Sequence, residues 1–247
     1  MGSDAIWQYA DENSKDTSEW AIEMAKKYHT YMAVGYLEKR NGDYYNSYLI
    51  ADWNKVYGIV RKSEGESYIF KTGDFPNVIA TPLGNIAVAI CYDSRRKHIY
   101  NNIKDETISL ILFPHGSPSD PNKASKEQAV IDTYCKQYVE AYNVPVAYIN
   151  CKGKLDYMMG KTGEMMMKAS FVLNGMSKIY SVSGTKLNGV SKEIIGISVN
   201  LVPQKLKKEI KFYGEDIVKG NWLFRKLVLV PDTKKGKEYY NKQVKHS

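Results

Sequence analysis

The feature that most constrains this sequence is a series of apolar, β-prone runs that alternate with helical patterns in its middle third. Residues 86–91 (IAVAIC), 108–114 (ISLILFP) and 144–150 (VPVAYIN) are apolar at nearly every position, which is typical of strands buried on both faces. Residues 95–104 can form a helix after the first run, and residues 124–142 a long helix before the third. This alternation predicts an α/β fold.

The segments before this region predict one helix and a set of short strands. Residues 16–29 show an apolar face at helical spacing from Ala21 onward, and Asp16 and Glu19 have the spacing of a capping box. Three β-prone runs follow, separated by turn residues, and we expect them to form neighbouring antiparallel strands. These runs are residues 31–37, 46–52 and 56–62.

Two further turn signals predict hairpins. Leu83-Gly84-Asn85 separates residues 77–82 from the run at 86–91, and Asn174-Gly175 separates two alternating runs within residues 168–182. Residues 193–201 (EIIGISVNL) are expected to close the sheet region.

The formal net charge of +8 is concentrated at the C-terminal end, where the last 45 residues hold twelve Lys and Arg but five Asp and Glu. We therefore divide the chain into a domain over residues 1–202 and a basic C-terminal extension over residues 203–247. Basic segments can contact nucleic acid. Apolar runs within this one favour an ordered, lysine-rich surface, and without a nucleic-acid-binding motif we do not expect nucleic acid as a partner.

The composition also bears on the compartment. No apolar window approaches the length that a bilayer requires, and the N-terminus does not resemble a signal peptide, so we expect no membrane association. The three cysteines, Cys91, Cys135 and Cys151, show no metal-type spacing and are odd in number. This argues against a disulfide framework or a zinc site and predicts a reducing, cytoplasmic location.

Cys91 stands where a buried strand gives way to a sharp turn and a helix. The N-terminus of a helix stabilises negative charge, so the sulfur can be held there as a thiolate. The backbone N–H of Tyr92 would point toward the oxygen of a carbon that the sulfur attacks, forming half of an oxyanion hole. Cys91 is therefore a candidate nucleophile for acyl transfer, although cysteines at strand ends also serve as small hydrophobes.

The segment YNSYLIADWNKVYGIVRKSEGESYIFKTGDFPNVIATPLGNIAVAICYDSRR resembles the nitrilase superfamily of carbon-nitrogen hydrolases. The specific part is an Arg-Lys pair ahead of Cys-Tyr-Asp, and SLILFPHGSP, VPVAYINCKG and KASFVLNGMSKIYSVSG extend the similarity to about residues 15–202. The resemblance implies a four-layer α-β-β-α sandwich, truncated at its N-terminus. It also implies a homodimer or higher homo-oligomer that acts on a small-molecule amide without a metal or cofactor.

The resemblance also implies roles for three side chains. Cys91 matches the nucleophile that forms a thioester, Lys62 matches the lysine that stabilises the oxyanion beside the N–H of Tyr92, and Glu66 matches the glutamate that orders the lysine. An ammonium near the sulfur favours the thiolate and later stabilises the developing O⁻. Taken alone, Lys62 and Glu66 would be a surface ion pair of little energetic value.

The family's general base is a glutamate in a Pro-Glu segment at the end of the second strand. No glutamate in residues 1–13 can be matched to it, because Glu12 has no predicted strand before it, and we interpret Glu38 as structural. Two interpretations stay open. One is a hydrolase with a truncated N-terminus, which the retention of Lys62, Glu66 and Cys91 favours; the other is a catalytically inactive binding or assembly module.

Three further side chains lie near the candidate nucleophile in sequence. Arg95 and Arg96 are candidate contacts for a substrate carboxylate, and a solvated surface beside acidic residues is an equal alternative. His115 follows a buried strand at the expected sheet end of Cys91, so it is a candidate substrate contact, with a Cys-His dyad as the rival mechanism. Overall the sequence predicts a thiol hydrolase of an amide or N-carbamoyl bond that releases ammonia.

Overall fold

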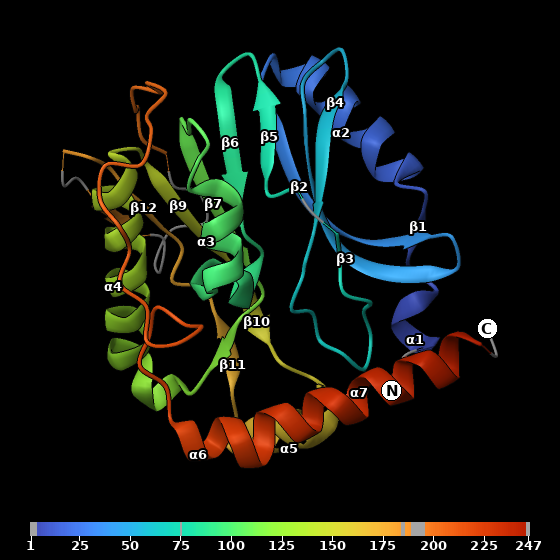
Figure 1. The fold of residues 1–247 in the computed structure, drawn as a ribbon. Coiled ribbons are helices and arrows are strands. Elements are labelled where there is room, and N and C mark those ends of the chain that lie inside the picture. The colour runs from blue at the N-terminus through green and yellow to red at the C-terminus, as the bar shows by residue number, and fades with distance from the viewer. Residues whose placement is uncertain (1–3, 75, 184–185, 189–195, 246–247) are drawn as a thin grey trace. The chain divides into compact units, whose positions relative to one another are not determined.

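The computed structural model describes residues 4–74, 76–183, 186–188 and 196–245 (Figure 1). The chain forms two compact units. The first unit contains residues 1–79, 159–162 and 221–247, and the second unit contains residues 80–158 and 163–220.

A four-stranded sheet with one helix along its face forms most of the first unit (Figure 1). The strands run in the order β1 (Asp11–Glu12), β2 (Met32–Arg40), β3 (Asp43–Ala51) and β4 (Val56–Arg61). The predicted antiparallel pairing of the three longer strands is confirmed. The two-residue β1, which pairs in parallel with β2, is not visible in the sequence because it is polar and short.

The helix α2 (Lys15–Tyr28) packs its predicted apolar face on this sheet through the buried Ala21 and Ala25. The predicted capping box is wrong. The carboxylate of Asp11 instead accepts the backbone N–H groups of Asp16 and Thr17 at 3.1 and 2.7 Å. A strand residue that precedes the helix therefore caps it, which a local pattern cannot reveal.

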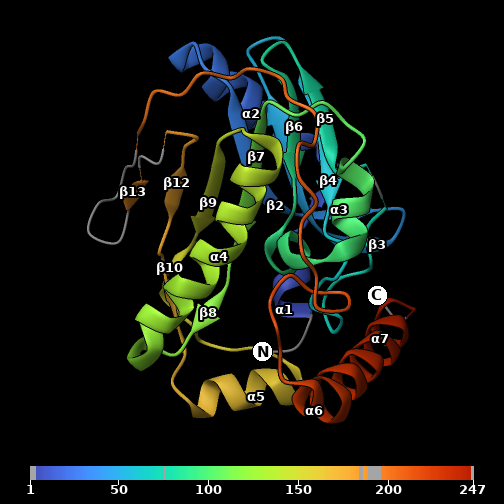
Figure 2. The same cartoon turned by 60° about the vertical axis from the view of Figure 1, so that its left-hand side comes forward.

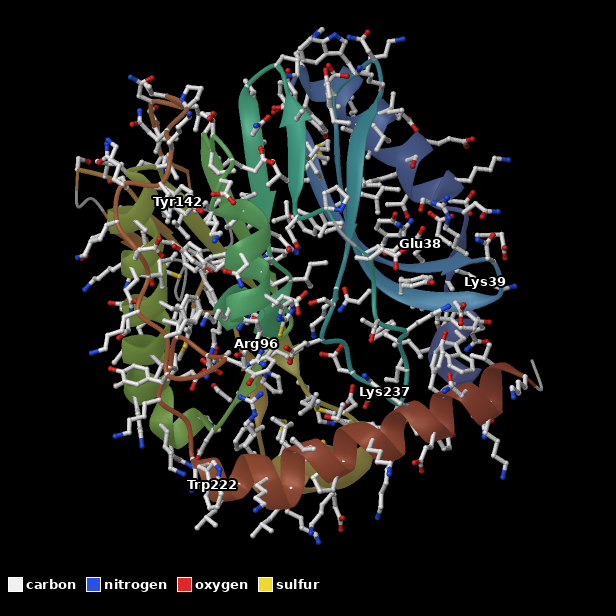
Figure 3. All side chains as sticks on the ribbon, in the orientation of Figure 1. Glu38, Lys39, Arg96, Tyr142, Trp222 and Lys237 are labelled. Atoms are coloured by element: carbon white, nitrogen blue, oxygen red, sulfur yellow. The ribbon has the colours of Figure 1, made fainter. Side chains whose placement is uncertain are left out.

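Glu38 lies fully buried on the α2 side of the sheet (Figure 3). Arg61 donates two hydrogen bonds to its carboxylate at 2.7 and 2.6 Å, and Ser47 and Ser14 donate one each at 2.6 and 3.1 Å. Burial alone would raise the pKa of Glu38, but the hydrogen bonds from Arg61 and Ser47 outweigh it and hold the pKa below its usual value. These partners agree with the structural interpretation of Glu38.

The C-terminal helix α7 (Val230–Val244) belongs to the first unit and packs on α1 (Asp4–Trp7) and β3. The rings of Trp7 and Tyr44 stack at 4.4 Å, and Tyr240 meets Trp7 edge-on at 5.7 Å. The Tyr240 hydroxyl accepts the backbone N–H of Tyr44 at 2.9 Å. Just before α7 lie α6 (Trp222–Phe224) and a π-helical turn (Arg225–Leu229).

Asp232 of α7 caps the start of α5 (Gly160–Lys168). The first residues of α5 belong to the first unit, and the rest of the helix is assigned to the second. Its carboxylate accepts the backbone N–H groups of Lys161 and Thr162 at 2.9 and 2.8 Å and the hydroxyl of Tyr68 at 2.9 Å. Burial opposes ionisation, but these hydrogen bonds outweigh it and lower the pKa of Asp232. Three donors therefore stabilise the ionised carboxylate.

The substitution Asp232→Asn is expected to destabilise the chain by about 1.5–3 kcal/mol at pH 7, because an amide oxygen replaces a charged acceptor. Because the pKa is lower in the folded chain, the carboxylate contributes stability above its unfolded pKa of about 3.9 and loses it as pH falls through the folded value. Urea unfolding should show a larger difference from the parent chain at pH 7 than near pH 3, because the stabilisation declines once the pH falls below the unfolded pKa. An equal difference at both values would contradict this account.

The second unit is built on a six-stranded sheet with α3 (Lys97–Ile103) and α4 (Ala124–Tyr142) packed beside it (Figure 2). The strand order is β13 (Lys186–Asn188), β12 (Lys178–Tyr180), β9 (Val146–Asn150), β7 (Leu110–His115), β6 (Gly84–Val88) and β5 (Val78–Thr81). The central strands β6, β7 and β9 are apolar, as predicted, and the structure pairs them in parallel. The long helix over residues 124–142 is also confirmed.

The predicted hairpin within residues 168–182 is wrong. β11 (Val172–Asn174) pairs with β10 (Lys152–Lys154) and β8 (Pro118–Ser119) in a three-stranded sheet, whereas β12 pairs with β9. Gly175 does adopt a left-handed φ of 75°, but the strands on either side of it join different sheets. Of the predicted strand at residues 193–201, residues 193–195 lie outside the described part, and 196–201 are not in a strand.

Residues 203–220 of the basic segment pack within the second unit. Gln204 forms a β-bridge with Ile108, with backbone hydrogen bonds of 2.7 and 2.8 Å in the two directions. The boundary that we placed at residue 202 stays a prediction. Within the described ranges, none of the helices combines the length and the apolar character needed to cross a bilayer. The predicted α/β class is confirmed, since each unit joins a sheet to its covering helices.

Candidate active site

Cys91 occupies a strained turn directly beyond β6 in the second unit. It begins a short 3-10 helix (Cys91–Arg95) and has φ 55°. This left-handed conformation is unfavourable in free energy for any residue that carries a side chain. The thiol is half-buried, and its Sγ lies 3.2 Å from the Oγ of Ser117. The strained turn presents the sulfur to a polar neighbour rather than to the apolar core.

Two polar residues, His115 and Ser117, stand at the end of β7, the parallel neighbour of β6. Nδ1 of His115 lies 3.0 Å from Oγ of Ser117, and Nε2 lies 3.5 Å from Oγ of Ser94 on the Cys91 turn. The imidazole also packs at 4.4 Å on the ring of Tyr148. The carboxyl ends of parallel strands meet at one edge of a sheet, and this brings His115 and Ser117 to the thiol.

Asn150, at the end of β9, holds the Ser117 loop in place. Its Oδ1 accepts the backbone N–H of Ser117 at 2.9 Å, and its Nδ2 donates to the carbonyl of Ser117 at 3.2 Å. Sequence reasoning named His115 but missed Ser94, Ser117 and Asn150. The signal for the last two was available, because each follows a buried parallel strand.

Arg95 and Arg96 lie in the same unit, and both guanidinium groups lie over the ring of Tyr92. Nε and Nη2 of Arg95 bind the two carboxylate oxygens of Asp216 at 3.1 and 2.9 Å. Arg96 is 4% exposed, and its guanidinium lies 5.2 Å from the ring centre of Tyr92. The sequence could not show that the acidic partner of Arg95 comes from the C-terminal segment, and a substrate contact for either arginine stays a prediction.

Lys62 and Glu66 form a close ion pair in the first unit, with Nζ and Oε1 2.6 Å apart. Lys62 follows β4, donates its backbone N–H to Asn46 at 2.8 Å and is 2% exposed. Burial would raise the pKa of Glu66, but the positive charge of Lys62 outweighs it and lowers the pKa. The pair is therefore not a solvated surface pair, and its predicted role at Cys91 stays a prediction.

Glu12 was excluded as a general base partly because no strand was expected there, and that reason is wrong, because Glu12 lies in β1. Its carboxylate instead pairs with Lys39 at 3.0 Å, and both side chains are well exposed. β2 and β3 separate β1 from β4, so three strand spacings of about 4.8 Å put Glu12 about 14 Å from the end of β4. This separation is too large for contact with Lys62.

Among the residues that the structure describes, no three His, Cys, Asp or Glu side chains gather in a way that could hold a metal ion. The polar groups near Cys91 are hydroxyls, an imidazole and an amide. Groups of this kind donate, accept and move protons.

Comparisons with solved structures show the same fold at low identity. A carbon-nitrogen hydrolase from Helicobacter pylori G27 matches with TM-score 0.62 and 17% identity over 74% of this chain and 65% of that one. Nit3 of Saccharomyces cerevisiae, a member of branch 10 of the nitrilase superfamily, matches with TM-score 0.55 and 16% identity over 75% and 66%. An amidase from Nesterenkonia sp. matches with TM-score 0.51 and 15% identity over 75% and 62%.

The chain thus covers slightly less than two thirds of the length of each of these three proteins. A search of curated proteins found no significant match. The profile of the family described as carbon-nitrogen hydrolase matches residues 2–211, which is most of the chain. The nitrilase-type fold is therefore confirmed, and the chain belongs to the carbon-nitrogen hydrolase family.

Proposed function

We propose that this chain is a thiol hydrolase of non-peptide C–N bonds that acts on an amide or N-carbamoyl compound and releases ammonia. The observation that carries the proposal is the placement of Cys91. Its thiol follows a buried parallel strand, sits on a strained left-handed turn and contacts a hydroxyl. Strain of this kind persists where surrounding structure holds it, and it is concentrated at functional sites.

In this reaction the Cys91 sulfur attacks the carbonyl carbon, ammonia leaves, and water hydrolyses the thioester. We assign stabilisation of the oxyanion to the ammonium of Lys62 and the backbone N–H of Tyr92. Glu66 holds that ammonium through the 2.6 Å contact. Membership of the family and the burial of Lys62 support these roles.

The proposal is tested with a panel of aliphatic amides, ω-amidated dicarboxylates, N-carbamoyl compounds and nitriles, by measuring ammonia release. Rapid acid quenching and mass spectrometry of the peptide that contains Cys91 should show the mass of the acyl group. Ammonia release together with an acyl group on Cys91 supports the proposal. If no substrate releases ammonia and none acylates Cys91, the chain is an inactive nitrilase-like binding or assembly module.

Lys62→Met tests the oxyanion role. Loss of one oxyanion donor is expected to lower kcat by about 10²–10³-fold, because the developing negative charge loses a preorganised partner. Lys39→Met is the matched control, since Lys39 also pairs with a glutamate but is exposed and lies on β2. An unchanged kcat in folded Lys62→Met protein would remove Lys62 from the mechanism.

A further inference from the structure

Residues 213–218 of the C-terminal segment bind the turn beyond β6 through their backbone. The backbone N–H of Ile217 donates to the carbonyl of Arg95 at 3.0 Å, and the backbone N–H of Lys97 donates to the carbonyl of Glu215 at 3.1 Å. All of these residues belong to the second unit. These hydrogen bonds fix the C-terminal segment to the end of the turn that begins at the candidate nucleophile.

The carboxylate of Asp216 is the centre of this contact. Oδ1 accepts Nε of Arg95 at 3.1 Å and the backbone N–H of Val218 at 2.7 Å. Oδ2 accepts Nη2 of Arg95 at 2.9 Å and the hydroxyl of Tyr92 at 3.1 Å. Asp216 is 6% exposed, and hydrogen bonds to a buried carboxylate are electrostatically stronger than they are in water. The carboxylate therefore holds two side chains of the turn that follows Cys91.

Tyr92 connects this carboxylate with the proposed reaction. Its backbone N–H is the group to which we assign half of the oxyanion hole, and its hydroxyl is the group that Asp216 binds. The guanidinium groups of Arg95 and Arg96 lie 5.4 and 5.2 Å from the centre of its ring. A residue that is held at its hydroxyl and over its ring has little freedom to turn, so the direction of its backbone N–H is restricted as well.

The left-handed backbone of Cys91 makes such a restraint necessary. A residue in this conformation keeps it only where the surrounding structure holds it there. Inside the turn, the hydroxyl of Ser94 donates to the carbonyl of Cys91 at 2.7 Å. Asp216 adds a restraint from a segment more than a hundred residues further along the chain.

We propose that Asp216 is a positioning residue for the oxyanion hole and acts through Tyr92. This inference rests on the proposed hydrolase function. It makes the direction of the Tyr92 N–H depend on Asp216, whereas the reactivity of the thiol does not depend on it. It also gives Arg95 a partner within the chain, which competes with the predicted contact of Arg95 to a substrate carboxylate.

Two reactions of Cys91 that need no natural substrate test this role. p-Nitrophenyl acetate acylates the thiol: the sulfur bonds to the carbonyl carbon through a tetrahedral oxyanion, the ester C–O bond breaks, p-nitrophenolate leaves, and the thiol proton passes to solvent. Iodoacetamide alkylates the same sulfur with loss of iodide and of the thiol proton, and no oxyanion forms. Acid quenching and mass spectrometry of the peptide that contains Cys91 measure both rates. The ratio of acylation to alkylation reports on the oxyanion hole.

Asp216→Asn is expected to lower the acylation rate of Cys91 by about 10–10²-fold, because a misdirected N–H stabilises the oxyanion poorly. The alkylation rate is expected to stay almost unchanged. Tyr92→Phe removes one hydroxyl and keeps the ion pair between Arg95 and Asp216, so it should lower the ratio in the same direction. The double variant should show less than the product of the two single effects, since both changes break the same contact.

Asp132→Asn is the matched control in the second unit. Asp132 of α4 also accepts hydrogen bonds from a cation and a phenol, namely from Lys178 at 2.8 Å and from Tyr180 at 2.7 Å. None of these three residues belongs to the Cys91 turn. This variant is expected to unfold at a lower temperature and to keep the ratio of the parent chain. The exposed Cys151 in the same digest is the internal reference for both reagents.

The outcomes separate the positioning role from the proposed hydrolase function. A lower ratio in Asp216→Asn and Tyr92→Phe, with Asp132→Asn unchanged, supports the positioning role even if no amide releases ammonia, and only the hydrolase function is then wrong. With an active amide, Asp216→Asn should lower kcat and leave KM almost unchanged.

Three results would overturn the positioning role. The first is an unchanged ratio in both folded variants, and ammonia release from an amide would then leave the hydrolase function intact. The second is an equal fall of the acylation and alkylation rates, which shows a general effect on the turn. The third is a parent chain in which the ratio for Cys91 is no greater than the ratio for Cys151, because no oxyanion hole then acts at Cys91.

Discussion

Cys91→Ala is expected to abolish ammonia release completely while leaving the fold intact. The thiol is the group of the chain that bonds to the substrate carbon in the proposed reaction, and alanine can take the same left-handed backbone conformation but offers no nucleophile. Cys91→Ser is expected to be almost as inactive, because a serine hydroxyl is a much weaker nucleophile than a thiolate near neutral pH. Ammonia assays on both variants, together with thermal unfolding, measure these effects.

Cys151→Ser is the matched control for this result. Cys151 is also a free cysteine, but it is exposed, so its replacement should leave both ammonia release and unfolding unchanged. Cys135 is fully buried and would test packing rather than chemistry. If ammonia release persisted in Cys91→Ala and disappeared in Cys151→Ser, the nucleophile would be Cys151, and our assignment of Cys91 would be wrong.

Glu38→Ala is expected to lower the free energy of unfolding by about 3–5 kcal/mol, because it removes the buried carboxylate and leaves the partly buried Arg61 without its charged partner. Ser14 and Ser47 lose the acceptor of their hydroxyls in the same step. Because the pKa of Glu38 is lowered in the folded chain, its stabilisation is present above the unfolded pKa of about 4.3 and fades as pH falls through the folded value. Urea unfolding at neutral pH measures the loss.

Glu12→Gln is the control for Glu38, since it breaks a glutamate-lysine pair of the same sheet in which both side chains are exposed. Exposed pairs contribute about 0–1 kcal/mol, so this variant should unfold almost as the parent chain does. Equal losses for the two variants would show that the burial of the Glu38 and Arg61 pair is not what stabilises the first unit.

Most regular elements could be predicted because their signals are local. The apolar runs of β6, β7 and β9 and the pattern of α4 specify strand or helix without reference to distant residues. Predictions failed where a distant segment competed with a local signal. Gly175 has the left-handed φ that a tight turn uses, but β11 finds its partners in β8 and β10, so the local hairpin does not form.

The candidate site divides in the same way. The sequence by itself determined that Cys91 follows an apolar run typical of a buried strand. It also determined that Lys62 and Glu66, four residues apart, precede Cys91 in the order typical of the family. The tertiary structure decided that Ser117 contacts the thiol and His115 contacts Ser117, that Asp216 binds the guanidinium of Arg95 and that Glu38 pairs with Arg61. The physical reason is that strand and helix propensities depend on neighbours along the chain, whereas hydrogen-bond partners depend on which strand ends share an edge and which charges are buried together.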